Sequence, residues 1–65
     1  MRMSQEEKKQ RLQLIHDYIE KNGSAHYGEL AKLLDLGPSA AMAWAKLATY
    51  FFEDLEYKGG VLRKR

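Results

Sequence analysis

The sequence contains no cysteine, which excludes disulfide bonds and cysteine-ligated zinc sites. It also has no uncharged stretch that approaches the roughly 20 apolar residues of a membrane-spanning helix. No apolar segment follows the charged N-terminal residues in the manner of a secretory signal. From these absences we expect an intracellular, cytoplasmic protein that does not enter a membrane.

Catalytic groups are equally scarce. The two histidines, His16 and His26, each have a carboxylate nearby in the sequence, Glu20 and Glu29, but neither pair has an evident third ligand or nucleophile. We interpret both pairs as surface residues rather than as metal or acid–base sites. A chain of 65 residues also offers little material for a cleft. We therefore expect no enzyme activity, no metal, no cofactor and no small-molecule ligand.

The small size of the chain also bears on its stability. With 45% hydrophobic and 31% charged residues, the composition is that of a globular protein and not of a disordered one. A domain of this length buries only about 60% of the surface that its unfolded chain exposes. Because disulfides are excluded, self-association is the remaining source of extra stability. We expect a single domain over 1–65 that forms a homodimer.

The net charge is only +2, from 11 basic and nine acidic residues, so the total does not establish nucleic-acid binding. Its distribution is more informative, because the segment after Glu56 is entirely free of acidic residues. The basic residues of this segment are Lys58, Arg63, Lys64 and Arg65.

The first half of the chain predicts two helices joined by a short strand. Ser4 and Glu7 fit a capping box for a helix over 4–21, which the Asn22-Gly23 pair ends. Leu12, Ile15 and Ile19 recur at helical spacing and form its apolar face. A short strand or extended connector is expected over 24–27, and a second helix over 29–35.

The second half predicts a third helix and a hairpin. Gly37 allows a left-handed turn after the second helix, and Pro38 cannot continue it. Ser39 is the expected cap of a helix over 39–53. A Gly59-Gly60 turn between two short apolar runs indicates a hairpin over 55–63. The expected class is therefore mainly α with a small β-hairpin.

The third helix divides into two stripes at about 100° per residue. One contains mostly large apolar side chains and is the expected core: Ala40, Trp44, Leu47, Ala48, Phe51 and Leu55. The other is more polar and faces outward: Ser39, Met42, Lys46, Thr49 and Glu53. The aromatic residues Tyr50, Phe51, Phe52 and Tyr57 are interpreted as core and hinge residues rather than as a base-stacking platform.

This order of elements, with the segment from Gly28 to Leu34 followed by Leu36-Gly37, resembles the winged helix-turn-helix DNA-binding domain of small prokaryotic, archaeal and viral regulators. Ala43 and Leu47 match the small and large core positions of that family's third helix. The resemblance implies a three-helix winged helix-turn-helix domain. The third helix would enter the major groove, and the wing would meet the DNA backbone.

The resemblance also implies positions for DNA contacts. On the third helix they are Ser39, Met42, Ala43, Lys46 and Thr49. On the wing they are Lys58, Arg63, Lys64 and Arg65. The helix lacks the Arg, Asn and Gln side chains that supply most direct base readout. We therefore expect a double-stranded DNA-binding protein of limited sequence specificity, acting as a transcriptional regulator.

An alternative arises from the width of the apolar surface on the same helix. Apolar residues cover about 200° of its circumference, whereas a surface helix needs little more than about 100°. The expected dimer or partner contacts are Ala41, Trp44, Ala45 and Phe52. Trp44 has three open interpretations, as a core residue packed on the first helix, a dimer contact or a nucleic-acid contact, of which the first is preferred. The alternative function is a protein–protein interaction module that docks through this apolar face.

Overall fold

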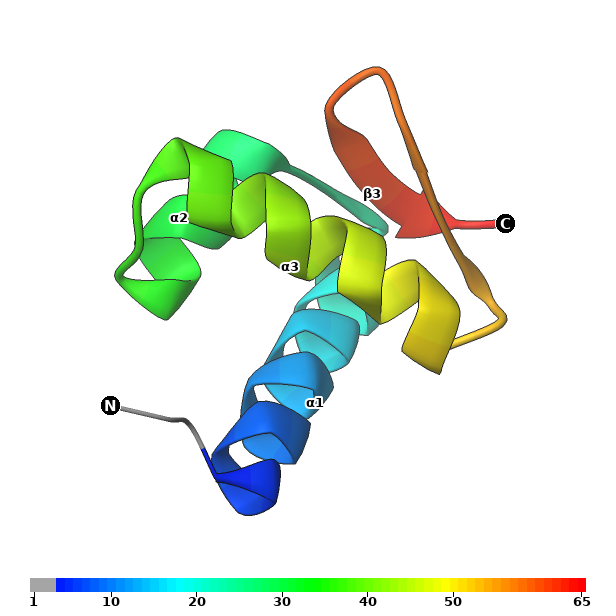
Figure 1. Cartoon of the computed structure of the whole chain (residues 1–65). Coiled ribbons are helices and arrows are strands. Elements are labelled where there is room, and N and C mark those ends of the chain that lie inside the picture. The colour runs from blue at the N-terminus through cyan, green and yellow to red at the C-terminus, as the bar shows by residue number, and fades with distance from the viewer. Residues whose placement is uncertain (1–3) are drawn as a thin grey trace.

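This computed structural model describes residues 4–65 as three helices and a small antiparallel sheet of three strands (Figure 1). The elements, in chain order, are α1 (Gln5–Asn22), β1 (Ser24–His26), α2 (Tyr27–Leu34), α3 (Pro38–Phe51), β2 (Leu55–Lys58) and β3 (Val61–Lys64). In Figure 1, α3 crosses in front of α1, and the β2–β3 hairpin lies beside α3. The prediction of a mainly helical chain with a small hairpin is confirmed. No helix among these residues is long and apolar enough to cross a membrane.

The first helix forms as its caps predict. The Ser4 hydroxyl oxygen accepts a hydrogen bond of 3.1 Å from the Glu7 backbone N–H, which satisfies one of the free amides of the first turn. Gly23 ends the helix with a φ of 86°, a conformation that glycine adopts without strain. The apolar face of α1, made of Leu12, Ile15 and Ile19, is fully buried.

The second helix begins earlier than predicted, at Tyr27 instead of 29. The reason is a cap that the sequence pattern did not indicate: His26 Nδ1 accepts a hydrogen bond of 3.1 Å from the Gly28 N–H. The helix ends at Leu34, and its C-cap residue, Asp35, takes the left-handed conformation with a φ of 56°. Gly37, expected to make that turn, has an ordinary φ of −73°.

The third helix starts at Pro38, with Gly37 as its N-cap, so the prediction that Ser39 caps it is wrong. Proline suits the first position of a helix because its missing N–H would have no partner there. The helix ends at Phe51, two residues before the predicted boundary. Ser39 thus lies inside the first turn, with its side chain exposed.

The buried face of α3 is made of alanines. Ala41, Ala45 and Ala48 are completely buried, whereas Leu47 and Phe51 of the predicted core stripe are exposed. The prediction followed side-chain size, but the small alanines are the residues that lie in one buried cluster with the large side chains of α1. Three earlier expectations are therefore wrong: the partner contacts, the core positions implied by the family resemblance, and the placing of Tyr50 in the core or hinge.

The first concerns partner contacts: Ala41 and Ala45 have no exposed surface with which to contact a second molecule. The second concerns the core positions implied by the family resemblance, because Ala43 and Leu47 both lie on the surface. Tyr50, expected in the core or hinge, is 87% exposed.

The sheet has the order β1-β3-β2, with both strand pairs antiparallel. Its inner face carries the buried side chains of Ala25, Leu55 and Leu62, and Tyr57 packs against the same core. The hairpin was predicted, but the pairing of β1 with β3 was not. Among the described residues, strand β1 pairs only with β3 and therefore forms an edge of the sheet. Because β1 follows α1 in the chain, this pairing connects the end of α1 to the hairpin.

The two-residue turn of the hairpin favours glycine at both positions, since Gly59 and Gly60 have φ values of 60° and 80°. An added Cβ at Gly60 would lie 3.2 Å from two ring carbons of Tyr27, whereas one at Gly59 would meet nothing within 4 Å. We expect Gly59→Ala to cost about 1–2 kcal/mol of unfolding free energy through backbone strain alone. Gly60→Ala should cost more, because the Tyr27 ring must also move. Urea unfolding of the two variants tests this, and an equal loss in both would contradict the Tyr27 contact.

Candidate nucleic-acid interface

The side of α3 opposite its alanine core is open to solvent. Ser39, Ala43, Lys46 and Tyr50 lie along this side, about 180° from the buried alanines on a helical projection, and all four are exposed. Lys46 is the only charged residue between 38 and 51, so the helix itself carries no acidic side chain. We call these four residues the outer face of α3.

Two predicted contact residues, Met42 and Thr49, lie beside the outer face and are half-buried. The Thr49 hydroxyl donates a hydrogen bond of 2.6 Å to the Lys46 carbonyl oxygen of its own helix. Its proton is therefore already in use, as is common for threonine within a helix. In this arrangement Thr49 can accept a hydrogen bond but has no proton to donate to a phosphate.

The opposite flank of α3 is apolar and partly exposed. Leu47 is 36% exposed and Phe51 54%, while Trp44 is half-buried beneath the Arg11 guanidinium, 5.6 Å from the ring centroid. Leu14 of α1 is also exposed, at 44%. We call Trp44, Leu47 and Phe51 the apolar flank. A shallow depression beside it is lined by Ala40, Ala43, Trp44 and Leu47.

The sequence patterns found only part of this flank. They assigned Leu47 and Phe51 to the core, and they did not single out the exposed Leu14 of α1. Phe52, predicted to contact a partner, is half-buried, and its ring lies 4.4 Å from the ring of His16.

The hairpin presents basic residues on the face of the sheet away from the core. Lys58 pairs with Val61 and Glu56 with Arg63 across the two strands, so Lys58 and Arg63 alternate with the buried residues and point outward. Arg63 Nε donates a hydrogen bond of 3.0 Å to Glu56 Oε2, and Arg63 Nη2 forms an ion pair with the same oxygen at 3.0 Å. Arg65 follows the last strand and is exposed.

Lys64 points the other way. It has the same orientation as the buried Leu62 and forms an ion pair with Glu20 of α1, which raises the pKa of the Lys64 ammonium group above its usual value. The four basic residues predicted for the wing therefore do not act together. Lys58, Arg63 and Arg65 face solvent, whereas Lys64 is held against α1.

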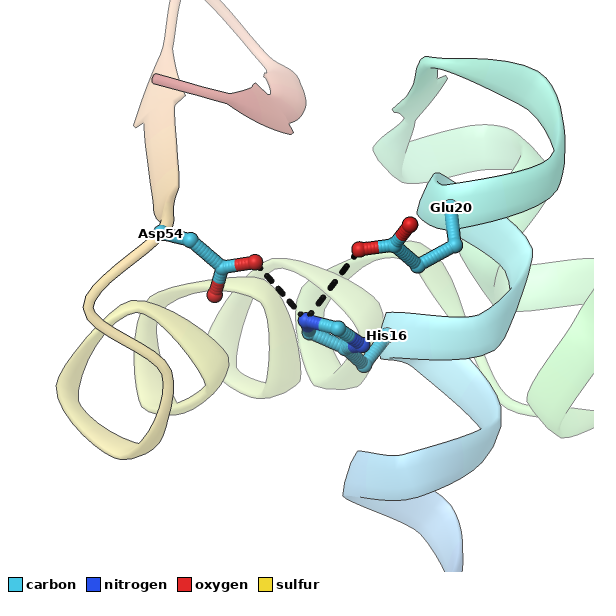
Figure 2. Close-up of side chains that lie close together, drawn as sticks. All are labelled: His16, Glu20 and Asp54. Carbon is cyan, nitrogen blue, oxygen red and sulfur yellow. Dashed lines mark hydrogen bonds and ion pairs between the residues drawn. The ribbon is translucent and has the colours of Figure 1, made fainter.

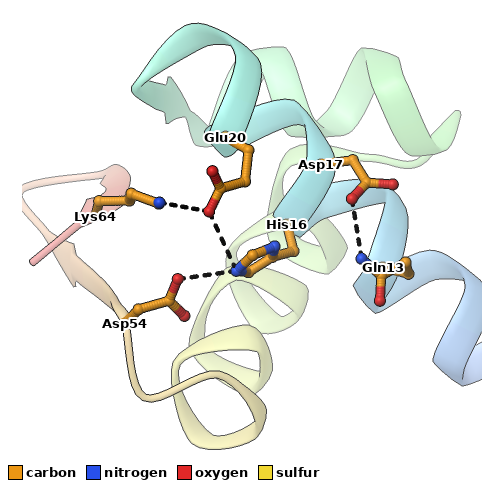
Figure 3. A network of polar contacts seen from close by, with 6 residues as sticks. All are labelled: Gln13, His16, Asp17, Glu20, Asp54 and Lys64. Atoms are coloured by element: carbon orange, nitrogen blue, oxygen red, sulfur yellow. Dashed lines mark hydrogen bonds and ion pairs between the residues drawn. The ribbon is translucent and has the colours of Figure 1, made fainter.

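Lys64 belongs to a polar network at the base of the hairpin. His16 Nε2 lies 2.9 Å from Asp54 Oδ2 and 3.8 Å from Glu20 Oε1 (Figure 2). Glu20 in turn contacts Lys64, while Gln13 and Asp17 form a separate hydrogen bond of 2.9 Å along α1 (Figure 3). The network joins α1 to the segment after α3 and to β3. Sequence spacing suggested only the His16–Glu20 pair, because Asp54 is 38 positions from His16.

This network predicts a pH effect on stability. The hydrogen bond from His16 lowers the pKa of the Asp54 carboxyl below its usual value, so the folded state binds that proton less tightly than the unfolded state does. The stabilisation is present above the unfolded pKa and is lost as the pH falls through the lower folded pKa, which is the range below about pH 4. In urea unfolding measured across this range, Asp54→Asn should lose less stability on acidification than the wild type. An identical acid dependence in both proteins would contradict the His16–Asp54 bond.

Comparisons of the chain with models of protein families, with curated protein sequences and with solved structures give no match. The function of the chain is therefore inferred from its own geometry. Two surfaces of the chain stand out. The first combines the outer face of α3 with the outward-pointing side of the hairpin, and the second is the apolar flank.

Proposed function

We propose that the protein is a winged-helix protein that binds double-stranded DNA and regulates transcription. The observation that carries this proposal is the outer face of α3, which is exposed, free of acidic side chains and accompanied by a hairpin with outward basic residues. In the proposed complex α3 lies at the major groove, and the hairpin serves as the wing on the backbone. Lys46, Lys58 and Arg65 neutralise phosphates directly, and Arg63 does so by exchanging its ion pair with Glu56 for a phosphate.

The side chains favour contacts with the DNA backbone over base readout. Ser39 and Ala43 are small, so the helix backbone can approach the duplex closely. The outer face has no Arg, Asn or Gln to form paired hydrogen bonds with base edges. Specificity then depends mainly on DNA shape and deformability, and sequence preference is limited.

A salt titration tests this proposal. Fluorescence anisotropy of a labelled generic duplex, measured at increasing salt, should show affinity falling with a log–log slope of about −3.6, which corresponds to about four phosphate contacts. The intrinsic fluorescence of Trp44 should also change on binding, because Trp44 lies on the flank of α3 beside the outer face. Absence of binding at low salt, or binding that does not depend on salt, would overturn the proposal.

A second candidate function is protein association through the apolar flank, and the exposure of Leu47 and Phe51 favours it. Its simplest form is a two-fold homodimer, the commonest symmetric assembly. Trp44 and Phe51 lie on a different side of α3 from Ser39 and Lys46, so such a dimer leaves the outer face free for DNA.

Sedimentation velocity tests the dimer with a matched pair of variants. Phe51→Glu should convert the dimer to a monomer, because it places a charge within the apolar flank. Tyr50→Glu adds the same charge at the neighbouring position on the outer face and should leave the dimer intact. A monomeric wild type at high concentration would exclude the homodimer.

A further inference from the structure

Three potential metal ligands come together at the base of the hairpin. His16 and Glu20 lie one turn apart on α1, and Asp54 approaches them from the segment between α3 and β2 (Figure 2). One ligand atom from each residue lies within 4.8 Å of the other two. Within residues 4–65 this is the only such group of three or more histidine, aspartate or glutamate side chains.

The distances suit a tetrahedral ion. Zinc bonds to imidazole nitrogen and carboxylate oxygen are about 2.0–2.2 Å long, so neighbouring ligand atoms around a tetrahedral zinc ion are about 3.3–3.6 Å apart. The distances from His16 Nε2 are 2.9 Å to Asp54 Oδ2 and 3.8 Å to Glu20 Oε1, one below and one above this range. Small side-chain movements would bring both carboxylates into place.

We propose that His16, Glu20 and Asp54 bind a zinc ion, with water in the fourth position. Imidazole and carboxylate groups are common zinc ligands, and the two carboxylates balance the charge of the ion. The His16 ring is oriented by the Phe52 ring, whose centroid is 4.4 Å away. The carboxylate side chains of Glu20 and Asp54 are about half exposed, which gives the ion a route from solvent.

Lys64 is the group that competes with the ion, because its ammonium pairs with the same Glu20 oxygen that lies nearest His16. A carboxylate has two oxygens, so Glu20 can give one to the ion and keep Lys64 on the other. The positive charge nevertheless opposes a cation at this position. Replacing Lys64 with methionine should therefore tighten zinc binding, while a substitution of the exposed Lys58 should not.

Zinc bound at this site would connect α1 directly to the segment that leads into the hairpin. The ion would hold the base of the hairpin against α1 by bonds that are stronger than the present hydrogen bond and ion pairs. This inference concerns metal binding and the rigidity of the hairpin, and it holds whether or not the protein binds DNA.

Thermal unfolding with zinc and with EDTA tests the site. Zinc at about a hundred times its dissociation constant should raise the Tm of the wild type by at least about 10 °C, through mass action on a small domain. His16→Ala should abolish the rise, and His26→Ala, at the only other histidine, should retain it. No rise in the wild type, or the same rise in His16→Ala, would overturn the proposal.

A measurement on the unmodified protein covers the case in which His16→Ala does not fold. In NMR spectra of the wild type, added zinc should shift the ring resonances of His16 and leave those of His26 unchanged. Shifts at both rings to the same extent, or at His26 alone, would show binding elsewhere and would contradict the site.

Discussion

Replacing Ala45 with leucine is expected to destabilise the protein by about 1–3 kcal/mol, the usual cost of forcing extra methylene groups into a packed core. Ala45 is completely buried and belongs to the same cluster as Leu12 and Ile15 of α1. A domain of this size has a total stability of only about 3–10 kcal/mol. The Tm should therefore fall by about 4–24 °C.

Ala43 provides the matched control for this substitution. It lies on the same helix, two positions earlier, but its side chain is exposed on the outer face. Ala43→Leu should change the free energy of unfolding by less than about 0.5 kcal/mol, as surface substitutions usually do. Urea unfolding and thermal melts of both variants measure the difference. Equal losses of stability at the two positions would contradict the alanine core of α3.

The second large effect concerns DNA binding. Changing Lys58, Arg63 and Arg65 together to glutamine should weaken duplex binding by roughly tenfold or more, because charge-assisted contacts to phosphate are lost. The salt dependence should also become shallower by about 2.7 in its log–log slope, the value for three phosphate contacts. Anisotropy titrations of the variant and the wild type at several salt concentrations measure both quantities.

A second triple variant controls for net charge. Lys8, Lys9 and Lys21 are exposed on α1, and their change to glutamine removes the same charge from a region outside the proposed interface. This variant should keep a slope close to that of the wild type. Lys64→Gln should also have little effect on DNA binding, because Lys64 is paired with Glu20 on the α1 side of the sheet. A control triple variant that weakens binding as much as the hairpin variant would show that only total charge matters.

The elements set by local chemistry were predictable from the sequence. Ser4 and Gly23 mark the ends of α1, and the Gly59-Gly60 pair defines the hairpin turn, because each signal acts over only a few residues. The pairing of β1 with β3 depends on residues 35 or more positions apart, such as His26 and Val61. No local pattern in a three-residue strand indicates such a partner.

The core of α3 was misjudged for a different reason. Large apolar residues usually occupy cores, but on this helix alanine forms the buried face, and Leu47 and Phe51 are left on its flank. Periodicity gives the angle between residues on a helix, and it does not say which side faces the rest of the protein. That choice depends on α1, α2 and the hairpin, whose large side chains lie in the same buried cluster as the alanines.

The candidate site was predictable as a set of residues but not as an arrangement. The acid-free segment after Glu56 identified the basic residues, yet the sequence did not show that Arg63 pairs with Glu56 and Lys64 with Glu20. These pairs arise from strand register and from the position of α1 under the sheet. Asp54 joins His16 for the same reason, through the packing of elements distant in the chain.

The most direct test of the account is an NMR titration of the isotope-labelled protein with a generic DNA duplex at low salt. The proposed function predicts that amide shifts concentrate on the outer face of α3, from Ser39 to Tyr50, and on the hairpin near Lys58 and Arg63. The amides at the start of α1 should change little. Shifts confined to α1, or no shifts at all at saturating DNA, would contradict the assignment of α3 and the hairpin as a DNA-binding surface.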